Sequence, residues 1–411
     1  MHAAFFTHAR AVLRYLPPVH FPLPPAVLLS AFRAAVSPPR SLRDATQGWL
    51  RDRFPNRAIT LTESGTSALA LAIARSGTAS SRGKTSGALV ALPAFGCPDL
   101  GAAAIAAGAR VTLYDLDPET LQPDEPSVAD ALDRGASHVV VAHWYGRASN
   151  ISMVAALAAK AEAVLIEDAA QGADASWNGV GAGNLSSWSI MSLGRGKGYN
   201  AGGGGILLSP EAYPVHGFEA RTPGAPASAL WHAATTMLTQ ILSHPLLYGV
   251  PARVPALGVG ETRYHAAIMG RPIANGAVAL LVAAFEQSTR AAGARRERER
   301  QYLEALADAT GLLLPRPDAR SVSGALRVPV LVHEARVAHL HRYGVVRSYP
   351  RVLGAYPEIA AHLVGPASLP GAALLSSAMH TLPTHGLLRP TDLDHIIRVL
   401  RDKGGARPTA P

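Results

Sequence analysis

Short apolar runs alternate with alanine-rich stretches through the first two thirds of the chain. The apolar runs predict buried strands at residues 59–61, 89–92, 111–114, 138–142, 164–167, 188–191 and 205–208. The stretches between them predict helices at 67–74, 99–107, 127–133 and 151–161. This alternation is typical of an α/β fold in which helices cover both faces of a mostly parallel sheet. Ligands of such sheets bind outside the carboxyl ends of the strands, so residues just after each strand are the candidates for chemistry.

Two proline-rich segments flank or interrupt this pattern. Residues 1–57 carry closely spaced prolines around a helix predicted at 27–36. We expect an arm that packs on the body or on a second subunit, and attachment to a membrane surface is the alternative. Within a predicted large domain at 58–262, the stretch 211–262 breaks the strand order with an apolar helix at 227–243. Packing of this insertion against the body is one interpretation, and a dimer or membrane contact is the other.

The C-terminal part predicts a smaller α+β domain at residues 263–402. It begins with a long helix at 275–307, continues with an alternating segment at 325–332 and ends with a helix at 391–401. Residues 403–411 contain two glycines and two prolines, which favours a loose tail.

The composition indicates a globular protein, because 48% of the residues are apolar and only 16% are charged. The net charge of +9 suits an anionic partner. The densest charged cluster, 295–300, alternates in sign on a predicted helix, so we interpret it as a solvated face and expect no nucleic-acid partner. The single cysteine, Cys97, excludes an internal disulfide and a cysteine-cluster metal site, and we expect no metal. With no apolar run of 18 residues and no secretory signal pattern, the expected location is the cytoplasm.

The most unusual local pattern is a lysine embedded among glycines. Lys197 lies between the predicted strands at 188–191 and 205–208, and four consecutive glycines follow at 202–205. A tight turn there leaves the amine free to reach inward, which suits a lysine that forms a Schiff base with an aldehyde. The alternative is a glycine-rich surface loop with a solvated lysine.

Polar residues also follow two other predicted strands. Gly65 and Thr66 lie in a small polar turn before a helix, where free backbone N–H groups can bind a phosphate or where the turn simply caps the helix. Asp168 follows the apolar strand at 164–167, so its carboxylate enters a mostly dry crevice and needs a cationic partner. A protonated pyridine nitrogen would be such a partner, whereas capping of the next helix is the alternative.

A third cluster, His143-Trp144-Tyr145, follows the strand at 138–142 and supplies aromatic walls. The histidine is either a polar contact or a satisfied core residue. Together with the phosphate turn, Asp168 and Lys197, this cluster describes a site for pyridoxal phosphate.

In their order along the chain, these motifs resemble the DegT/StrS-type aminotransferases, fold-type-I pyridoxal phosphate enzymes that aminate keto sugars, usually nucleotide-linked. The resemblance spans roughly residues 40–210, with a weaker echo at Leu382-Pro383-Thr384-His385. The motifs that carry it are Ser64-Gly65-Thr66-Ser67-Ala68-Leu69, Leu92-Pro93-Ala94-Phe95, Ala107-Gly108-Ala109, Asp115-Leu116-Asp117, His143-Trp144-Tyr145-Gly146, Glu167-Asp168-Ala169-Ala170-Gln171, and Ser192 five residues before Lys197.

The resemblance implies a large domain with a mostly parallel seven-stranded sheet, a smaller C-terminal domain, and a homodimer with its sites at the subunit boundary. It implies that Lys197 binds the cofactor covalently, that Asp168 pairs with the ring nitrogen, and that Gln171 lies near the ring or its 3-hydroxyl. The implied cofactor-binding set is Gly65, Thr66, Ser67, Phe95, Cys97, Asp168, Gln171, Ser192 and Lys197. The implied substrate contacts are His143, Trp144, Tyr145 and His385.

Two positions depart from the family pattern. The family usually has an aromatic residue, stacked on the cofactor ring, two places after Phe95, but Cys97 stands there. Cys97, Phe95 or Trp144 is therefore the candidate for the stacking position. The residue after the lysine, commonly Asn in the family, is Gly198.

The resemblance implies amino transfer from glutamate or glutamine to a keto sugar or a related cyclic ketone. Two alternatives remain open. One is a lyase or dehydratase that uses the same cofactor, although the sugar dehydratases that resemble this family replace the lysine. The other is a non-catalytic homologue that serves as a scaffold in a glycan-assembly or membrane-associated complex.

Overall fold

The computed structural model describes residues 14–36, 40–77, 87–213, 226–254, 261–269, 271–365, 369–402 and 408. The predicted tail at 403–411, apart from residue 408, lies outside the described residues. So do residues 1–13 of the predicted arm and parts of the stretch 211–262.

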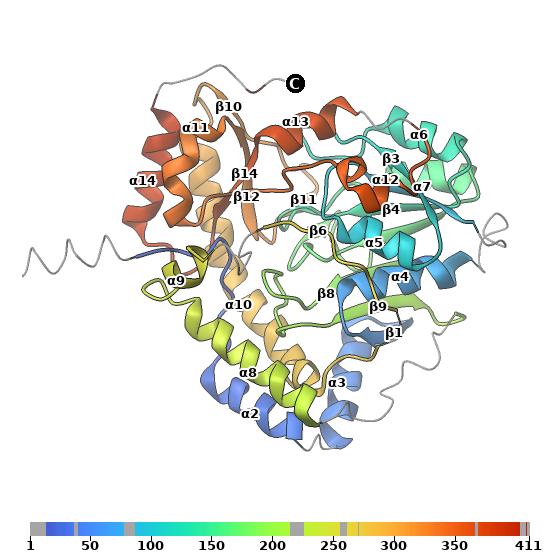
Figure 1. Ribbon diagram of the computed structural model, residues 1–411, viewed down its shortest axis with the longest axis horizontal. Coiled ribbons are helices and arrows are strands. Elements are labelled where there is room, and N and C mark those ends of the chain that lie inside the picture. Colours follow the sequence, from blue (N-terminus) through green and yellow to red (C-terminus); the bar gives the residue numbers. More distant parts are fainter. Residues whose placement is uncertain are drawn as a thin grey trace, which may run out of the picture.

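A seven-stranded sheet forms the centre of the molecule (Figure 1). Its strand order is β1-β9-β8-β5-β4-β2-β3, and β9 runs antiparallel to both of its neighbours while the other adjacent pairs are parallel. The prediction of an α/β fold with a mostly parallel seven-stranded sheet is therefore confirmed. The strands are β1 Arg57–Thr62, β2 Leu89–Pro93, β3 Arg110–Tyr114, β4 His138–Ala142, β5 Val164–Asp168, β8 Trp188–Ser192 and β9 Gly205–Pro210.

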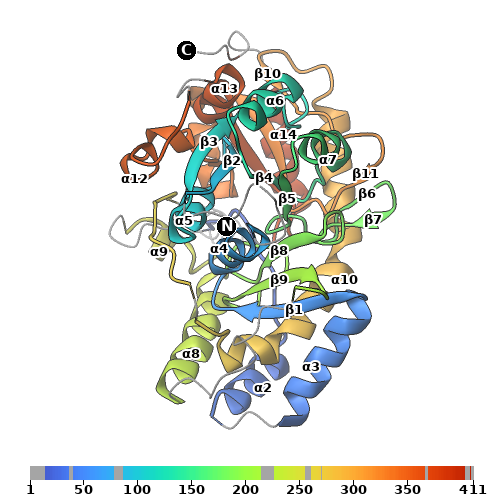
Figure 2. The same cartoon turned by 90° about the vertical axis from the view of Figure 1, so that its right-hand side faces the viewer.

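Four helices connect these strands and cover the sheet from both sides (Figure 2). Helices α4 (Gly65–Ser76) and α5 (Asp99–Ala106) pack together on one face, and α6 (Glu125–Asp133) packs with α7 (Ile151–Lys160) on the other. Three of them begin at a side chain that accepts a hydrogen bond from the first turn: Ser64 before α4, Asp124 before α6 and Asn150 before α7. All four lie within a few residues of the predicted helices, because the local sequence pattern marks each helix and a capping side chain precedes three of them.

A second, antiparallel sheet lies in the C-terminal part of the chain. Its order is β10-β12-β14-β13, with β10 Leu312–Leu313, β12 Arg327–Val332, β13 Val346–Arg347 and β14 Met379–Pro383. The helices around it are α11 (Glu334–Val337), α13 (Pro370–Ala378) and α14 (Pro390–Arg401), and the short α12 (Pro357–Ala360) contacts α5. The small sheet of β6 (Ser176–Trp177), β7 (Val180–Gly181) and β11 (Ser321–Val322) connects the two parts. The domain boundaries at 262 and 402 stay predictions.

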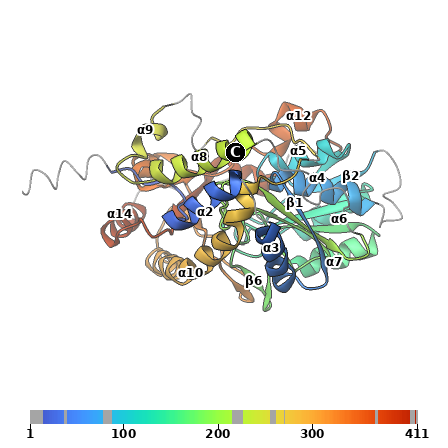
Figure 3. The ribbon, with the colours of Figure 1, turned by 90° about the horizontal axis from the view of Figure 1, so that it is seen from below.

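The N-terminal arm packs on the body of the protein. Helix α2 (Pro25–Val36) lies against α8 (Pro226–Leu242) and the long α10 (Asn275–Ala305), and α3 (Arg40–Arg53) also contacts α10 (Figure 3). The short α9 (Gly249–Ala252) follows α8. In the part of the chain that is described, no helix is both long and apolar enough to cross a membrane.

Candidate active site

The glycine-rich loop after β8 turns Lys197 toward the end of the central sheet. The Lys197 N–H donates to the Gly194 carbonyl over 3.2 Å, which closes a tight turn. Gly198 packs so closely that an added Cβ would lie 2.0 Å from the Cβ of Ala173. The ammonium group of Lys197 is near enough to Asp168 for its charge to lower the pKa of that carboxyl. The interpretation of Lys197 as a wholly solvated loop lysine does not fit this position.

Asp168 is the last residue of β5, and β5 pairs directly with β8. Its carboxylate oxygen Oδ1 accepts a hydrogen bond from the Ala170 N–H over 2.8 Å, so the carboxylate also caps the following turn. Burial raises the pKa of Asp168, and the Ala170 hydrogen bond and the charge of Lys197 offset this only in part. A carboxylate in this position is further stabilised by any cation that enters the crevice.

The start of α4 and the end of β8 form a compact polar cradle. A Cβ added to Gly65 would lie 2.8 Å from the Cβ and 3.1 Å from the hydroxyl of Ser192, so the two backbones approach because Gly65 has no side chain. The backbone N–H groups at the start of α4 carry the positive end of the helix dipole. Gly65, Thr66 and Ser192 therefore fit a phosphate group.

Ser67 uses its donors inside the protein. Its N–H donates to the Ser64 hydroxyl over 3.1 Å, and its own hydroxyl donates to the Ile268 carbonyl over 2.6 Å. Ser67 therefore shapes the cradle by holding the 268 segment against α4, and its predicted direct contact with a cofactor stays a prediction.

The three candidates for the stacking position differ in exposure. Phe95 is 0% exposed and Trp144 is 3% exposed, and their rings pack against each other with centroids 5.7 Å apart. Cys97 keeps an intermediate exposure. Burial raises the pKa of the Cys97 thiol to about 12, with Asp99 adding to the rise and Lys197 opposing it. Cys97 is thus a small, neutral group that packs against the hydrophobic core containing Phe95 and Trp144.

Gln171 lies beside a tyrosine that sequence reasoning missed. The Gln171 Nε2 group donates to the Tyr349 hydroxyl over 2.5 Å, and its Oε1 accepts from the Tyr145 N–H over 3.3 Å. Tyr349 has a φ of 45°, and its ring packs edge-on to Phe95 with centroids 5.4 Å apart. The hydroxyl of Tyr145 donates to Ser348 over 2.7 Å. The segment after β13 therefore closes one side of the site, and no local pattern in the sequence marks it.

His143 lies behind the site rather than in it. Its Nδ1 accepts from the Ser149 N–H over 3.1 Å, so the proton is on Nε2, which donates to Glu167 over 2.8 Å. Both ring nitrogens are thus engaged inside the protein, as expected of a satisfied core histidine. Neither ring nitrogen of His143 is therefore free to bind a substrate, and the predicted substrate contact of His143 stays a prediction.

His385 contacts the N-terminal arm. Its Nε2 donates to the Pro17 carbonyl over 2.8 Å, and its Nδ1 accepts from the Leu387 N–H over 3.3 Å. Burial lowers the pKa of His385 to about 4. The residue fixes the arm against the C-terminal part, and nothing in its position supports the predicted substrate contact.

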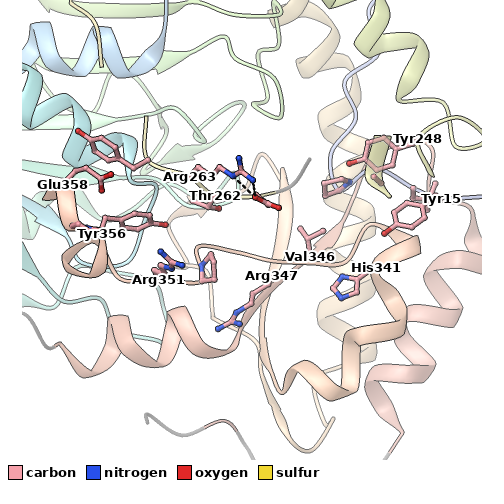
Figure 4. A pocket seen from close by; sticks show the side chains of 17 residues that line it. Tyr15, Tyr248, Thr262, Arg263, His341, Val346, Arg347, Arg351, Tyr356 and Glu358 are labelled. Carbon is pink, nitrogen blue, oxygen red and sulfur yellow. Dashed lines mark hydrogen bonds and ion pairs between the residues drawn. The ribbon is translucent and has the colours of Figure 1, made fainter. Parts of the chain in front are cut away.

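A cavity of about 660 Å³ adjoins the site (Figure 4). Tyr15 and Tyr248 lie at one end, and Tyr356 and Glu358 at the other. Burial raises the pKa of Tyr356, and the nearby Cys97 adds to the rise, so this end borders the candidate cofactor site. The basic side chains on its wall are Arg263, Arg347, Arg351 and His341, against the carboxylates of Glu261 and Glu358.

Among the residues described, no group of three or more His, Cys, Asp or Glu side chains is arranged to hold a metal ion.

Part of the sequence matches one protein family and a set of curated relatives. Residues 54–214 match the DegT/DnrJ/EryC1/StrS aminotransferase family. The chain is 30% identical over 149 residues to the L-glutamine:2-deoxy-scyllo-inosose aminotransferase of Streptomyces lividus, covering 36% of this chain and 34% of that protein. It is 28% identical over 130 residues to the dTDP-4-dehydro-2,3,6-trideoxy-D-glucose 4-aminotransferase of Saccharopolyspora spinosa, covering 31% and 33%. The matched segment spans about a third of these relatives.

Solved structures are similar over nearly the whole chain. The aminotransferase TlmJ from Streptoalloteichus hindustanus has a TM-score of 0.70 at 21% identity and covers 94% of this chain and 98% of its own. The E. coli GDP-4-keto-6-deoxy-D-mannose-3-dehydratase with bound hydrated PLP has a TM-score of 0.71 at 14% identity, covering 94% and 99%. The fold-type-I architecture is confirmed, but the fold alone does not separate amino transfer from dehydration.

Proposed function

We propose that the chain, whose residues 54–214 match the DegT/DnrJ/EryC1/StrS aminotransferase family, transfers an amino group from glutamate or glutamine to a nucleotide-linked keto sugar or to a related cyclic ketone. Its proposed cofactor is pyridoxal 5′-phosphate. The observation that carries this proposal is the placement of Asp168 at the end of β5 and of Lys197 in the loop after the paired strand β8, close enough to interact electrostatically.

The residues present fit the cofactor at its phosphate end. The absence of a side chain at Gly65 lets the start of α4 approach Ser192 closely, so the Ser192 hydroxyl lies beside the first turn of the helix. Backbone N–H groups of Gly65 and Thr66 and the Ser192 hydroxyl would bind the phosphate at the positive end of the helix.

A second set of residues fits the ring of the cofactor. Asp168 would pair with the pyridine nitrogen, and a protonated nitrogen would supply the cation that its buried carboxylate needs. Gln171, fixed by Tyr349, would lie beside the ring, and Cys97 would cover one face of it. When bound, the cofactor supplies an electron sink for breaking the carbon–hydrogen bond of the amino donor.

Lys197 would perform two tasks. Its amine would hold the cofactor in the resting enzyme, and after the amino donor displaces it the same amine would move a proton within the site. The tight turn that begins at Gly194 keeps the amine at the end of β8 in both tasks.

The adjoining cavity is the proposed acceptor site. Three arginines and His341 face it against two glutamates, so it suits an anionic acceptor. The guanidinium carbon of Arg351 lies 6.0 Å from the centroid of the Tyr356 ring, a pair on which a flat, polar group can stack. Both features agree with a nucleotide-linked sugar.

The proposed assembly is a homodimer in the cytoplasm. Ile268 and Met269 are 47% and 38% exposed beside the α4 cradle, where Ile268 already contacts Ser67. A second copy that covered these side chains would close the phosphate end of the site. Arg271, with a side chain 65% exposed, lies in the same segment and would reach the partner.

The test is the visible spectrum of the purified protein after incubation with pyridoxal phosphate. The wild type should be yellow, and Lys197→Ala should lose the absorption band. Arg195→Ala is the matched control, because Arg195 is exposed in the same loop, two residues earlier, and its loss should leave the band unchanged. A colourless wild type that ignores added cofactor would contradict the proposal.

The donor half-reaction separates amino transfer from the lyase or dehydratase alternative. Glutamine or glutamate should convert the yellow form to the pyridoxamine form without any ketone present. An enzyme that keeps its yellow band with both donors but consumes a keto sugar would favour the dehydratase.

A further inference from the structure

Helix α8 presents an uncharged, apolar stripe to the outside of the protein. Trp231 is 73% exposed, Leu238 is 53% exposed and Ile241 is 49% exposed, and they recur at the spacing that places residues on one side of a helix. Met237, 51% exposed, widens the stripe. The 17 residues of α8 include no Asp, Glu, Lys or Arg.

The apolar surface continues beyond the end of α8. Fifteen large apolar side chains are exposed in the described part of the chain, and eight of them lie between Trp231 and Val254. The eight are Trp231, Met237, Leu238, Ile241, Leu246, Leu247, Val250 and Val254. Two more, Leu29 and Phe32, lie on α2, which packs against α8 (Figure 3). Isolated exposed apolar residues are normal, but a concentration of this kind marks a contact surface.

The opposite side of α8 is fixed on the loop that follows the lysine. Its His232 side chain donates from Nε2 to the Ala201 carbonyl over 3.1 Å. A Cβ on Gly202 would lie only 2.1 Å from the Thr236 hydroxyl, so the loop and the helix fit together only because that residue is glycine. The helix therefore cannot rotate to bury its apolar stripe without losing these contacts.

The two described segments that form and flank the stripe, 14–36 and 226–254, contain no Asp or Glu. The whole chain has 29 acidic residues in 411, or one in about 14. Arg33 on α2 and Arg253 just after α9 are both exposed. An apolar face edged by arginine and free of carboxylates complements an anionic lipid surface.

We propose that α8, the residues up to Val254, and the exposed edge of α2 form a face that docks on the surface of an anionic lipid bilayer. A second copy of the chain is the competing occupant. Self-pairing would bring the arginines of two identical faces together with no carboxylate of these segments to neutralise them. The charge pattern favours lipid, and the segment around Ile268 remains the proposed dimer contact.

The test uses the full-length protein and phosphatidylcholine vesicles with and without phosphatidylglycerol, in a flotation assay. The wild type should float with the anionic vesicles and much less with the neutral ones. Trp231→Gln, Leu238→Gln and Ile241→Gln combined should lower the apparent partition coefficient at least about tenfold, because three apolar side chains no longer enter the interface. Arg33→Gln with Arg253→Gln should reduce the preference for anionic vesicles by about fivefold per arginine.

The matched control carries the same substitution on another face. Val180 and Val322 are 43% and 49% exposed in the small β6-β7-β11 sheet, and their replacement by Gln should leave flotation unchanged. Equal flotation of the wild type with and without lipid would overturn the proposal. So would a triple variant whose molar mass by light scattering falls by half, because the face would then lie between two copies. The wild-type comparison of the two vesicle types needs no variant and stands even where a variant folds poorly.

Discussion

Replacing Glu167 by glutamine tests whether the floor of the candidate site depends on a charged carboxylate. Glu167 precedes Asp168 in β5 and is 0% exposed. Its Oε1 accepts hydrogen bonds from His143 and Gly183, and its Oε2 accepts from Leu185, Ser186 and Ser189, over 2.5 to 3.2 Å. Burial on its own raises the pKa of Glu167, but the hydrogen bond and charge of His143 and the other donors outweigh it, so the pKa is lowered.

The expected cost follows from these donors. Glutamine keeps one carbonyl oxygen and places an NH₂ group where the other oxygen was, so two or three buried donors lose their acceptor and face another donor. Each unsatisfied buried group costs roughly 1 to 3 kcal/mol, and neighbouring losses partly overlap, so Glu167→Gln should lower the free energy of unfolding by about 3 to 5 kcal/mol at pH 7.

The sign of the pH dependence is fixed by the lowered pKa. The carboxylate contributes its stability above its ordinary value of 4.5 and loses it as the pH falls through the lower folded value. The difference between wild type and Glu167→Gln should therefore be constant from pH 7 down to about 4.5 and shrink below that.

Urea unfolding of both cofactor-free proteins across this pH range gives the measurement. Glu286→Gln is the control, because Glu286 forms an exposed ion pair with Arg290 at 3.1 Å and should cost only about 0.3 to 0.5 kcal/mol. A loss below about 1 kcal/mol for Glu167→Gln, or a difference that does not change with pH, would refute the reasoning.

Two further predictions concern the cradle and the ring. Gly65→Ala should weaken binding of pyridoxal phosphate at least about tenfold, since its Cβ would lie 2.8 Å from that of Ser192. Titration with pyridoxal, which lacks the phosphate, should show no such change, and equal losses with both compounds would contradict a phosphate cradle. Tyr349→Phe should lower the free energy of unfolding by about 1 to 2 kcal/mol, because the Gln171 amide loses its acceptor. Tyr213→Phe, at a tyrosine 41% exposed, is its control, and equal effects of the two would argue against a role for the hydroxyl.

The polar turn residues that follow the strands were predictable because they depend on local pattern. Short apolar runs predicted the seven strands of the main sheet, and the candidate polar residues follow the ends of these runs. The proximity of Asp168 and Lys197 could therefore be expected without coordinates, since parallel strands carry their carboxyl ends to the same side. No helix was predicted at α3, because its amphipathic pattern is short and lies between prolines.

Other residues could be assigned only once the chain was folded. Gln171 and Tyr349 are 178 residues apart, and neither lies in a pattern that signals the other. The sequence left two roles open for His143, a polar contact or a satisfied core residue, and only the fold shows that its two ring nitrogens bond to Ser149 and Glu167. Side-chain partners of this kind depend on which strands pair and how closely the layers pack.

The sequence by itself determined the sheet, the edge at which chemistry is possible, and the residue types suited to a phosphorylated aldehyde cofactor. These follow from the period of apolar residues and from the chemistry of single side chains. Only the tertiary structure decided that Cys97 lies near Lys197 while Phe95 is buried, that Tyr349 from the C-terminal part contacts Gln171, and that α8 turns its apolar stripe outward. Those outcomes depend on packing between segments distant in sequence, which no local pattern encodes.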